Sequence, residues 1–267
     1  MGELIFIGLG LHDERGISLR GLEEMENAGA IFVEAYTNLM EGLRIKKLEK
    51  LARNKIISVS RRMLEEEEGK LILDSARKGK TVFLVPGDPL IATTHVDLRI
   101  RAEKAKINTR IIHGASIISA AIGLSGLQNY KFGRSVTIPF PNGAIISELP
   151  YEVVQANLQV GNHTLCFLDI KAEESKYMTI KDAIEILRLI EKRRQEHVIS
   201  PNMLAVGIAR AGSEEPIVKA DLVPMLVDYD FGKPPHIIIF PGKLHFMEAE
   251  ALVKFAEAPE SIRELTK

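Results

Sequence analysis

Hydrophobic residues along the chain occur in short runs that alternate with amphipathic stretches. In the first 112 residues, apolar and β-branched runs predict strands at 4–10, 30–35, 55–59, 81–85 and 109–112. The intervening segments have the apolar spacing of helices near 18–28, 43–52, 63–78 and 93–105. Because helices separate consecutive strands, we expect parallel pairing and a sheet covered on both faces.

Charged residues mark the ends of the third of these helices. The acidic run 65–68 stands at its predicted start, and Arg77, Lys78 and Gly79 stand at its end. This arrangement complements the helix dipole and supplies a C-cap. The charge run is therefore expected to be structural.

The residue composition changes near residue 113, where a stretch of small residues begins with His113-Gly114-Ala115-Ser116. Beyond it, strands are predicted at 135–138, 164–168, 203–209 and 235–240. Thr179 begins a capping box for a helix to about residue 194, and a last helix is predicted over 246–257. We expect an α/β protein with two α/β domains, residues 1–112 and 113–267.

Composition narrows the class of partner. The chain has 267 residues, of which 46% are hydrophobic, so it can bury a large core. Its 35 basic and 36 acidic residues give a net charge of −1, which is not the footprint of a nucleic-acid or anionic-membrane partner. The single cysteine, Cys166, is expected to be a small core residue in a reducing compartment. The N-terminal stretch lacks the basic region and the apolar length of a signal peptide, so we expect a cytoplasmic protein.

Loops at the ends of predicted strands hold the candidate chemistry. The stretch 82–95, VFLVPGDPLIATTH, stops an apolar run at Pro86-Gly87-Asp88-Pro89. Proline removes backbone donors and glycine permits positive φ, so this stretch predicts a rigid turn that presents Asp88. An ordinary strand-to-helix connection, with Asp88 as a turn residue, is an alternative interpretation of the same residues. Three other loops, 8–11, 114–117 and 209–213, are also small and weakly polar, and they offer backbone groups and close approach to a ligand.

The sequence lacks the complete motifs of several common binding and catalytic sites. The stretch 8–11 begins like a dinucleotide fingerprint, but Asp13 replaces the third glycine. The stretch 207–213 has phosphate-loop glycines without the lysine. The histidines lack metal-site spacing, and no motif predicts a covalent nucleophile, so we expect no metal site. The loops suit a ligand that brings its own reactivity.

Specific motifs then point to a family. FIGLGLHDERGISLRGLE, VEAYTNLM, VPGDPLIATTH, HGASIISAA, GLSGLQNYKFG, HTLCFLDIKAEE, ARAGS and FGKPPHIIIFPGKLHFMEAE occur in that order. Together they resemble the diphthine synthase family, within the class III, tetrapyrrole-methylase-like fold of S-adenosylmethionine-dependent methyltransferases. The GDP loop alone would identify only the superfamily.

The resemblance implies two α/β domains with S-adenosyl-L-methionine bound in the cleft between them. It carries cofactor-binding positions over to Leu11, Asp88, Ile91, Ser116, Ile117, Leu168, Ala211 and His236. It also implies that the acceptor is the modified histidine of translation elongation factor 2, methylated to form diphthine in diphthamide biosynthesis. His236 opens the apolar run 236–240, and a lone histidine there has an ordinary structural explanation as well.

A homodimer is a further implication of the resemblance. The apolar run 237–240 and a terminal helix expected to expose Phe246, Leu252 and Phe255 are in keeping with it.

Methyl transfer from a sulfonium needs few catalytic groups, because the leaving group is neutral and alignment supplies much of the rate. The acceptor amine must first lose a proton. Glu34 and His12 are candidate bases, and an exposed place on a helix face explains each equally well. We expect successive transfers to a trimethylated product. The alternatives are a methyltransferase of the same fold acting on a small molecule or tetrapyrrole, and a non-catalytic S-adenosylmethionine-binding module; a dehydrogenase ranks lowest.

Overall fold

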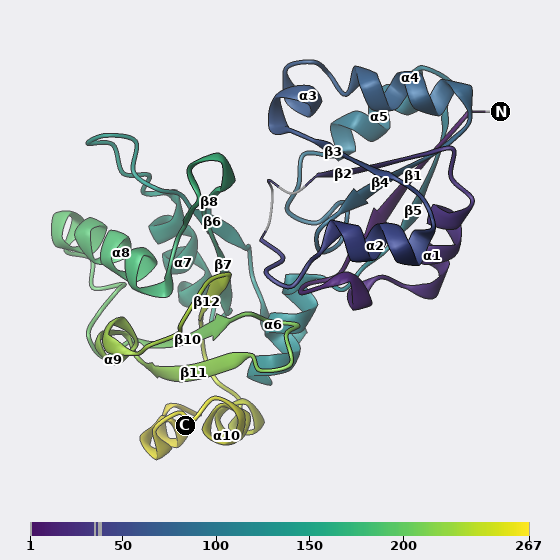
Figure 1. The fold of residues 1–267 in the computed structure, drawn as a ribbon. Coiled ribbons are helices and arrows are strands. Elements are labelled where there is room, and N and C mark those ends of the chain that lie inside the picture. Colours follow the sequence, from purple (N-terminus) through teal and green to yellow (C-terminus); the bar gives the residue numbers. More distant parts are fainter. Residues whose placement is uncertain (1, 35, 37–38, 267) are drawn as a thin grey trace. The chain divides into compact units, whose positions relative to one another are not determined.

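The computed structural model of the protein describes residues 2–34, 36 and 39–266. The chain divides into two compact units: unit 1 is Met1–Ile117 with Ala172–Ser175, and unit 2 is Ile118–Lys171 with Lys176–Lys267. Figure 1 labels the elements of each unit along the chain. Each unit has its own sheet, so the α/β class predicted from the sequence is confirmed.

Five strands form a parallel sheet in the described part of unit 1, in the order β3-β2-β4-β1-β5. Their bounds are Ile56–Val59, Ala30–Glu34, Lys80–Val85, Glu3–Gly8 and Asn108–Ile112. The predicted strand 30–35 matches β2, although residue 35 lies outside the described residues. The parallel pairing expected from the alternation of strands and helices is confirmed.

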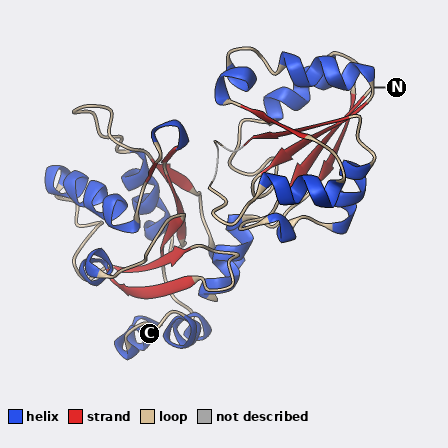
Figure 2. Ribbon diagram, in the orientation of Figure 1, coloured by secondary structure: helices blue, strands red, loops and turns tan. Residues whose placement is uncertain are grey.

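Helices pack on both faces of this sheet (Figure 2). They are α1 (Leu19–Glu26), α2 (Ile45–Ala52), α3 (Arg61–Glu65), α4 (Lys70–Lys78) and α5 (Val96–Lys104), with a short 3-10 turn, η1, at Glu14–Gly16. Successive residues of a strand face opposite sides. Leu4 and Phe6 therefore join the core under α4 and α5, whereas Ile5 and Ile7 join the core under α1 and α2.

The prediction of a single helix over residues 63–78 is wrong in one respect. The structure divides this segment into α3, which ends at Glu65, and α4, which begins at Lys70. Glu68 and Gly69 both have positive φ, 56° and 64°, and this conformation ends one helix before the next begins. The acidic residues 66–68 therefore lie in the connection, while Gly79 is the C-cap that the sequence predicts.

Unit 2 contains a mixed sheet in the order β11-β10-β12-β7-β6 among its described residues. The strands are Ile217–Leu222, Leu204–Ala209, His236–Phe240, Thr164–Leu168 and Val136–Ile138. Only β6 and β7 pair in parallel; the other pairs are antiparallel. The edge strand β11 is absent from the sequence-based prediction, since its half-buried residues lack a clear apolar run.

The remaining elements of unit 2 cover and connect this sheet. The helices are α6 (Ile117–Ser125), α7 (Leu149–Gln159), α8 (Ile180–Arg194), α9 (Val223–Asp228) and α10 (Phe246–Phe255). The shorter pieces are η2 (Asn129–Lys131), β8 (Ile170–Lys171), β9 (Lys176–Tyr177) and η4 (Glu260–Thr266). The turn η3 (Ala172–Glu174), between β8 and β9, belongs to unit 1. The capping box predicted at Thr179 is confirmed: its hydroxyl accepts a hydrogen bond from Asp182 N–H, and Asp182 accepts one from Thr179 N–H.

Two expectations about unit 2 concern burial. Cys166 lies in the core, as predicted, and burial raises the pKa of its thiol. The argument for exposed apolar residues is wrong at Leu252, which is fully buried, although Phe246 and Phe255 are 64% and 66% exposed. The apolar run 237–240 belongs to the central strand β12, so the core of unit 2 explains it. No helix in the described ranges is long and apolar enough to cross a membrane.

Candidate cofactor site

The carboxyl ends of three neighbouring strands of unit 1 carry the loops selected from the sequence. Strand β1 pairs with both β4 and β5, and all three run in parallel. The loops that follow Gly8, Val85 and Ile112 therefore leave the sheet at the same edge, where ligands bind in open α/β sheets. Leu11 is in the first loop, Asp88 and Ile91 in the second, and Ser116 in the third, with Ile117 at the start of α6.

Glycines allow these three loops to touch through their backbones. A Cβ atom on Gly8 would lie 2.5 Å from the carbonyl oxygen of Gly87 and 2.5 Å from the backbone nitrogen of Gly114, which no side chain tolerates. Gly10 and Gly87 exchange two backbone hydrogen bonds, Gly10 N–H to Gly87 O at 3.2 Å and Gly87 N–H to Gly10 O at 2.7 Å. The result is a preformed backbone surface lined by small residues.

Asp88 is buried, with 6% of the residue exposed, so the expectation that it is presented rather than packed is wrong. Its Oδ1 accepts a hydrogen bond from Leu90 N–H at 3.2 Å, and its Oδ2 lies 2.7 Å from His113 Nδ1, which donates to the carboxylate. His113 is 75% exposed at its side chain and is a site residue that the sequence analysis did not select. Its place directly after β5 is the signal that could have found it.

The other predicted positions of unit 1 line the same loops. Leu11, Ser116 and Ile117 are half-buried, and Ile91 is exposed with its N–H donating to Asp88 O. The three loops thus combine apolar side chains with backbone polar groups. Such a lining fixes the orientation of a ligand without requiring fixed charge.

Unit 2 brings its three predicted positions together at one edge of its own sheet. Ala209 pairs with His236 and Phe167 pairs with Ile237, so the ends of β10 and β7 flank the start of β12. Leu168 ends β7, and Ala211 follows β10; both are buried. This edge is therefore the second candidate surface for a ligand.

The two ring nitrogens of the buried His236 differ in their hydrogen bonds. Its Nδ1 accepts a hydrogen bond from Ile180 N–H at 3.4 Å, whereas its Nε2 has no hydrogen-bond partner among the described residues. The same is true of Ser213 Oγ in the turn after Ala211. Burial lowers the pKa of His236, although the backbone carbonyls of Lys233 and Gly232 act to raise it, so the ring is neutral at pH 7 and its Nε2 can donate. Buried polar atoms without partners are rare, and these two could pair with hydroxyl or amino groups of a bound ligand.

The two candidate bases occupy different surroundings. Glu34 ends β2 and is fully buried, and His12 lies half-buried in the loop after β1, so neither occupies an exposed helix face. Glu34 Oε2 accepts a hydrogen bond from Tyr36 N–H at 3.0 Å, and its Oε1 lies 4.0 Å from Nε2 of His95. Because β2 pairs with β4, this carboxylate lies at the same edge as the loop of Asp88. Residues 35, 37 and 38 of the VEAYTNLM motif lie outside the described residues.

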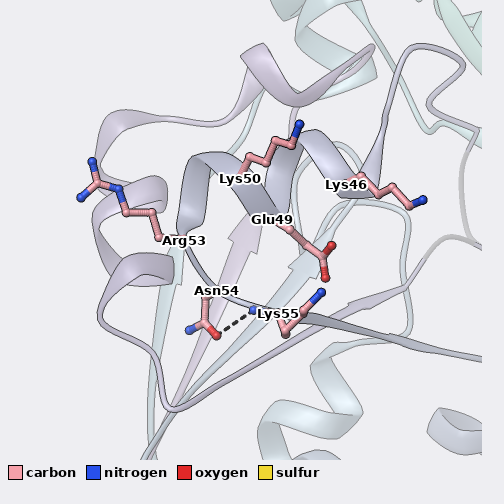
Figure 3. A pocket seen from close by; sticks show the side chains of 6 residues that line it. All are labelled: Lys46, Glu49, Lys50, Arg53, Asn54 and Lys55. Atoms are coloured by element: carbon pink, nitrogen blue, oxygen red, sulfur yellow. Dashed lines mark hydrogen bonds between the residues drawn. The ribbon is translucent and has the colours of Figure 1, made fainter.

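A hollow away from these loops is lined by Lys46, Glu49, Lys50, Arg53, Asn54 and Lys55 (Figure 3). Asn54 and Lys55 immediately precede β3, so the hollow lies at the amino ends of the parallel strands. This is the edge opposite the glycine loops. Its cationic side chains extend from α2 and the following connection, and it is separate from the candidate cofactor site.

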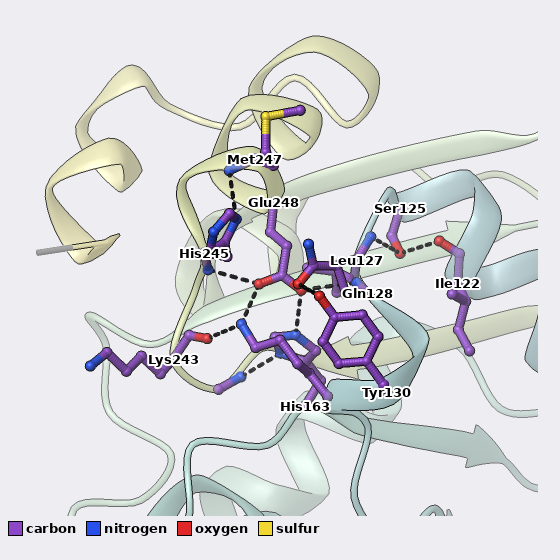
Figure 4. A network of polar contacts seen from close by, with 12 residues as sticks. Ile122, Ser125, Leu127, Gln128, Tyr130, His163, Lys243, His245, Met247 and Glu248 are labelled. Atoms are coloured by element: carbon purple, nitrogen blue, oxygen red, sulfur yellow. Dashed lines mark hydrogen bonds and ion pairs between the residues drawn. The ribbon is translucent and has the colours of Figure 1, made fainter.

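A buried polar network in unit 2 surrounds Glu248 of α10 (Figure 4). Glu248 Oε1 accepts hydrogen bonds from Gln128 N–H at 2.9 Å and His163 Nε2 at 2.8 Å. Its Oε2 accepts from His245 N–H at 2.8 Å and from Lys131 Nζ. Burial alone would raise the pKa of Glu248, but these donors together lower it to about 2. Each oxygen has two donors, which is typical of a structural carboxylate.

Comparisons with known proteins cover nearly the whole chain. A family model described as Tetrapyrrole (Corrin/Porphyrin) Methylases matches residues 3–223. The chain is 51% identical to a diphthine synthase from Methanosarcina acetivorans, over 99% of this chain and 100% of the relative. It is 50% identical to a diphthine synthase from Methanosarcina barkeri, over 96% and 97%.

A solved structure gives the same result. A crystal structure of diphthine synthase matches with a TM-score of 0.88 and 41% identity, covering 98% of this chain and 99% of that one. The resemblance found in the motifs of the sequence is therefore confirmed at the level of sequence and of fold.

Proposed function

Because the chain belongs to the diphthine synthases of the tetrapyrrole (corrin/porphyrin) methylase family, we propose that it methylates the modified histidine of translation elongation factor 2. The protein is an S-adenosylmethionine-dependent methyltransferase of diphthamide biosynthesis. The acceptor is the amino group of the 3-amino-3-carboxypropyl histidine, and successive transfers give the trimethylated product. The observation that carries this proposal is full-length similarity to diphthine synthases at about 50% identity.

The cofactor positions are part of the same proposal. In unit 1, the proposed positions are Leu11, Asp88, Ile91, Ser116 and Ile117, which lie in or directly after loops whose glycines let their backbones touch. In unit 2, Leu168, Ala211 and His236 lie at one sheet edge, where the buried His236 Nε2 and Ser213 Oγ have no hydrogen-bond partner among the described residues. These features fit S-adenosylmethionine, which would supply a methyl group on a sulfonium.

The residues of the chain would then bind and align rather than react covalently. Apolar side chains such as Leu11 and Ile91 would exclude water, and Asp88 Oδ2 could accept hydrogen bonds beside the one from His113. A displacement with a neutral leaving group gains most from such alignment. We further propose that the enzyme is a cytoplasmic homodimer, with Phe246 and Phe255 of α10 as exposed apolar residues available to an interface.

The decisive experiment uses the purified protein, S-adenosylmethionine and elongation factor 2 that carries the 3-amino-3-carboxypropyl histidine. We expect the modified peptide to gain one, two and three methyl groups by mass spectrometry. Elongation factor 2 with an unmodified histidine is the matched control and should gain none. A peptide of unchanged mass, with binding of the cofactor verified by calorimetry, would contradict the proposed acceptor and favour a small-molecule substrate.

A further inference from the structure

His95 has an unusual place behind the Asp88 loop. Its side chain is 2% exposed, and its ring packs edge-on against Phe83 of β4, with centroids 5.1 Å apart. Its Nδ1 lies 3.2 Å from the carbonyl oxygen of Pro89, in the loop that holds Asp88. A carbonyl oxygen only accepts, so Nδ1 carries the proton in the neutral ring. The lone pair of the ring is therefore on Nε2.

That lone pair faces a polar cluster. His95 Nε2 has no hydrogen-bond partner among the described residues, and neither does the buried phenol oxygen of Tyr36. The Glu34 Oε1 is 4.0 Å from His95 Nε2. The negative charge of Glu34 also raises the pKa of the Tyr36 phenol, after the larger effect of burial. The polar atoms of Glu34, Tyr36 and His95 are thus shielded from bulk water, and the charge of Glu34 acts on both of the other groups.

Such a cluster has the chemistry to receive an ammonium group. A primary ammonium has three N–H donors and a positive charge, which a carboxylate, a phenol oxygen and an imidazole nitrogen can accept. Burial lowers the pKa of His95, although the charges of Glu34 and Glu65 and the carbonyl of Pro89 act to raise it, so the ring is neutral and able to take a proton at pH 7. Burial likewise raises the pKa of Tyr36, with Glu34 and Glu65 adding to the effect and Arg61 opposing it, so the phenol stays protonated.

We propose that Glu34, Tyr36 and His95 form the subsite for the acceptor amine, with His95 Nε2 as the general base. This inference rests on the proposed function and assigns the proton acceptor of its reaction. The N–H bond of the substrate ammonium breaks, its electron pair stays on the substrate nitrogen, and the proton bonds to His95 Nε2. The nitrogen lone pair then takes the methyl group from S-adenosylmethionine, whose sulfur keeps the electron pair of the broken C–S bond.

The cluster also explains how repeated transfers are possible. Each transfer leaves a positively charged nitrogen, so the next one requires another proton to leave. His95 must release its proton to solvent between rounds, and the neighbouring Thr94 and Val96 are exposed. Glu34 stabilises the imidazolium while it holds the proton, since the two groups lie 4.0 Å apart.

The test is the pH dependence of the first methyl transfer in His95→Asn. The Asn amide can still donate toward Pro89 O, as His95 Nδ1 does, but the variant lacks Nε2. We expect single-turnover methyl transfer to elongation factor 2 at pH 7 to fall about 10²- to 10⁴-fold, the usual range for removal of a general base. At pH 9.5 the free amine is abundant, so most of that loss should be recovered. Calorimetric binding of S-adenosylhomocysteine should be unchanged.

A matched variant and a second mutation complete the design. His197→Asn makes the same change at an exposed residue outside the cluster and should keep the wild-type profile. Glu34→Gln removes the negative charge beside His95 and so lowers the pKa of its ring, which should move the acidic limb of the pH–rate profile to lower pH. This measurement tests the assignment of His95 if His95→Asn does not fold. An equal loss at pH 7 and pH 9.5, or a rate within twofold of wild type, would overturn the assignment of His95. A wild-type enzyme that transfers nothing to this acceptor would instead overturn the proposed function, and the inference with it.

Discussion

Replacing Glu248 by glutamine should destabilise unit 2 strongly, because the change converts one acceptor into a donor inside a fully paired network. The carboxylate of Glu248 is fully buried and accepts from Gln128 N–H, His163, His245 N–H and Lys131. In Glu248→Gln one oxygen becomes an NH₂ group that faces two of these donors. At least two charge-assisted hydrogen bonds disappear, and the Lys131 ammonium loses its buried counterion.

The magnitude follows from these contacts. A hydrogen bond to a charged group contributes about 1.5–3 kcal/mol, and breaking a buried ion pair on one side costs about 3–5 kcal/mol. We take the second range, because it already includes the stranded partner. For a unit of roughly 150 residues, this loss lowers the midpoint of thermal unfolding by about 6–20 °C. Scanning calorimetry of the whole chain measures it.

The stability that the Glu248 carboxylate contributes should depend on pH in the acid range. The folded-state pKa of Glu248 is about 2, below its ordinary value of 4.5. A lowered carboxylate pKa means that its stabilisation is complete above pH 4.5 and is lost as the pH falls towards 2. The difference in stability between wild type and Glu248→Gln should therefore be constant from pH 6 to 5 and should narrow below 4.5.

Glu185→Gln is the matched control, since it makes the same chemical change at an exposed position of α8 and should alter stability by less than about 0.5 kcal/mol. A midpoint for Glu248→Gln within 2 °C of wild type, or a difference that does not narrow in acid, would refute the reasoning.

Two further predictions concern the glycine loops and the assembly. Gly114→Ala places a Cβ against the backbone of Gly87 and Gly8, so S-adenosylmethionine should bind at least about tenfold more weakly by calorimetry, as expected for overpacking against an immobile backbone. The control variant Gly123→Ala, whose Cβ meets nothing within 4 Å, should bind the cofactor normally. Equal affinities of the two variants would contradict a role for the loops in cofactor binding. Sedimentation velocity should show a homodimer, and Phe246→Glu should shift it towards monomer because a charge replaces an exposed apolar ring; a wild-type monomer at micromolar concentration would contradict the proposed dimer.

The sequence predicted the elements that local patterns determine. Strands of unit 1 are continuous apolar runs because helices cover both faces of their sheet, and proline and glycine mark where those runs end. The loop of Asp88 can be predicted from the sequence for that reason. The break at Gly69 was missed because the apolar periodicity continues through it, and β11 was missed because an edge strand needs no buried run.

The chemistry of the site depends on contacts that no local pattern contains. Asp88 meets His113, which lies 25 residues away, and Glu34 meets His95, which lies 61 residues away. The sheet order brings these pairs together, because β2, β4, β1 and β5 are neighbours although they are dispersed along the chain. The sequence could therefore select Asp88 and Glu34 as single residues but could not identify their partners.

Two buried glutamate–histidine pairs occur in the part of the chain that the structure describes, and their hydrogen bonding distinguishes a structural pair from a reactive one. His163 donates through Nε2 to Glu248 at 2.8 Å and accepts through Nδ1 from Gly242 N–H at 2.9 Å, so protonation would break a bond that the fold already makes. His95 has its proton on Nδ1, and its Nε2 lone pair lies 4.0 Å from Glu34 without a hydrogen-bond partner in the described ranges. A proton can therefore join His95 without breaking a hydrogen bond, and the nearby carboxylate stabilises it there. Burial lowers the pKa of both histidines, so their different hydrogen bonds, rather than their burial, assign stability to one pair and proton transfer to the other.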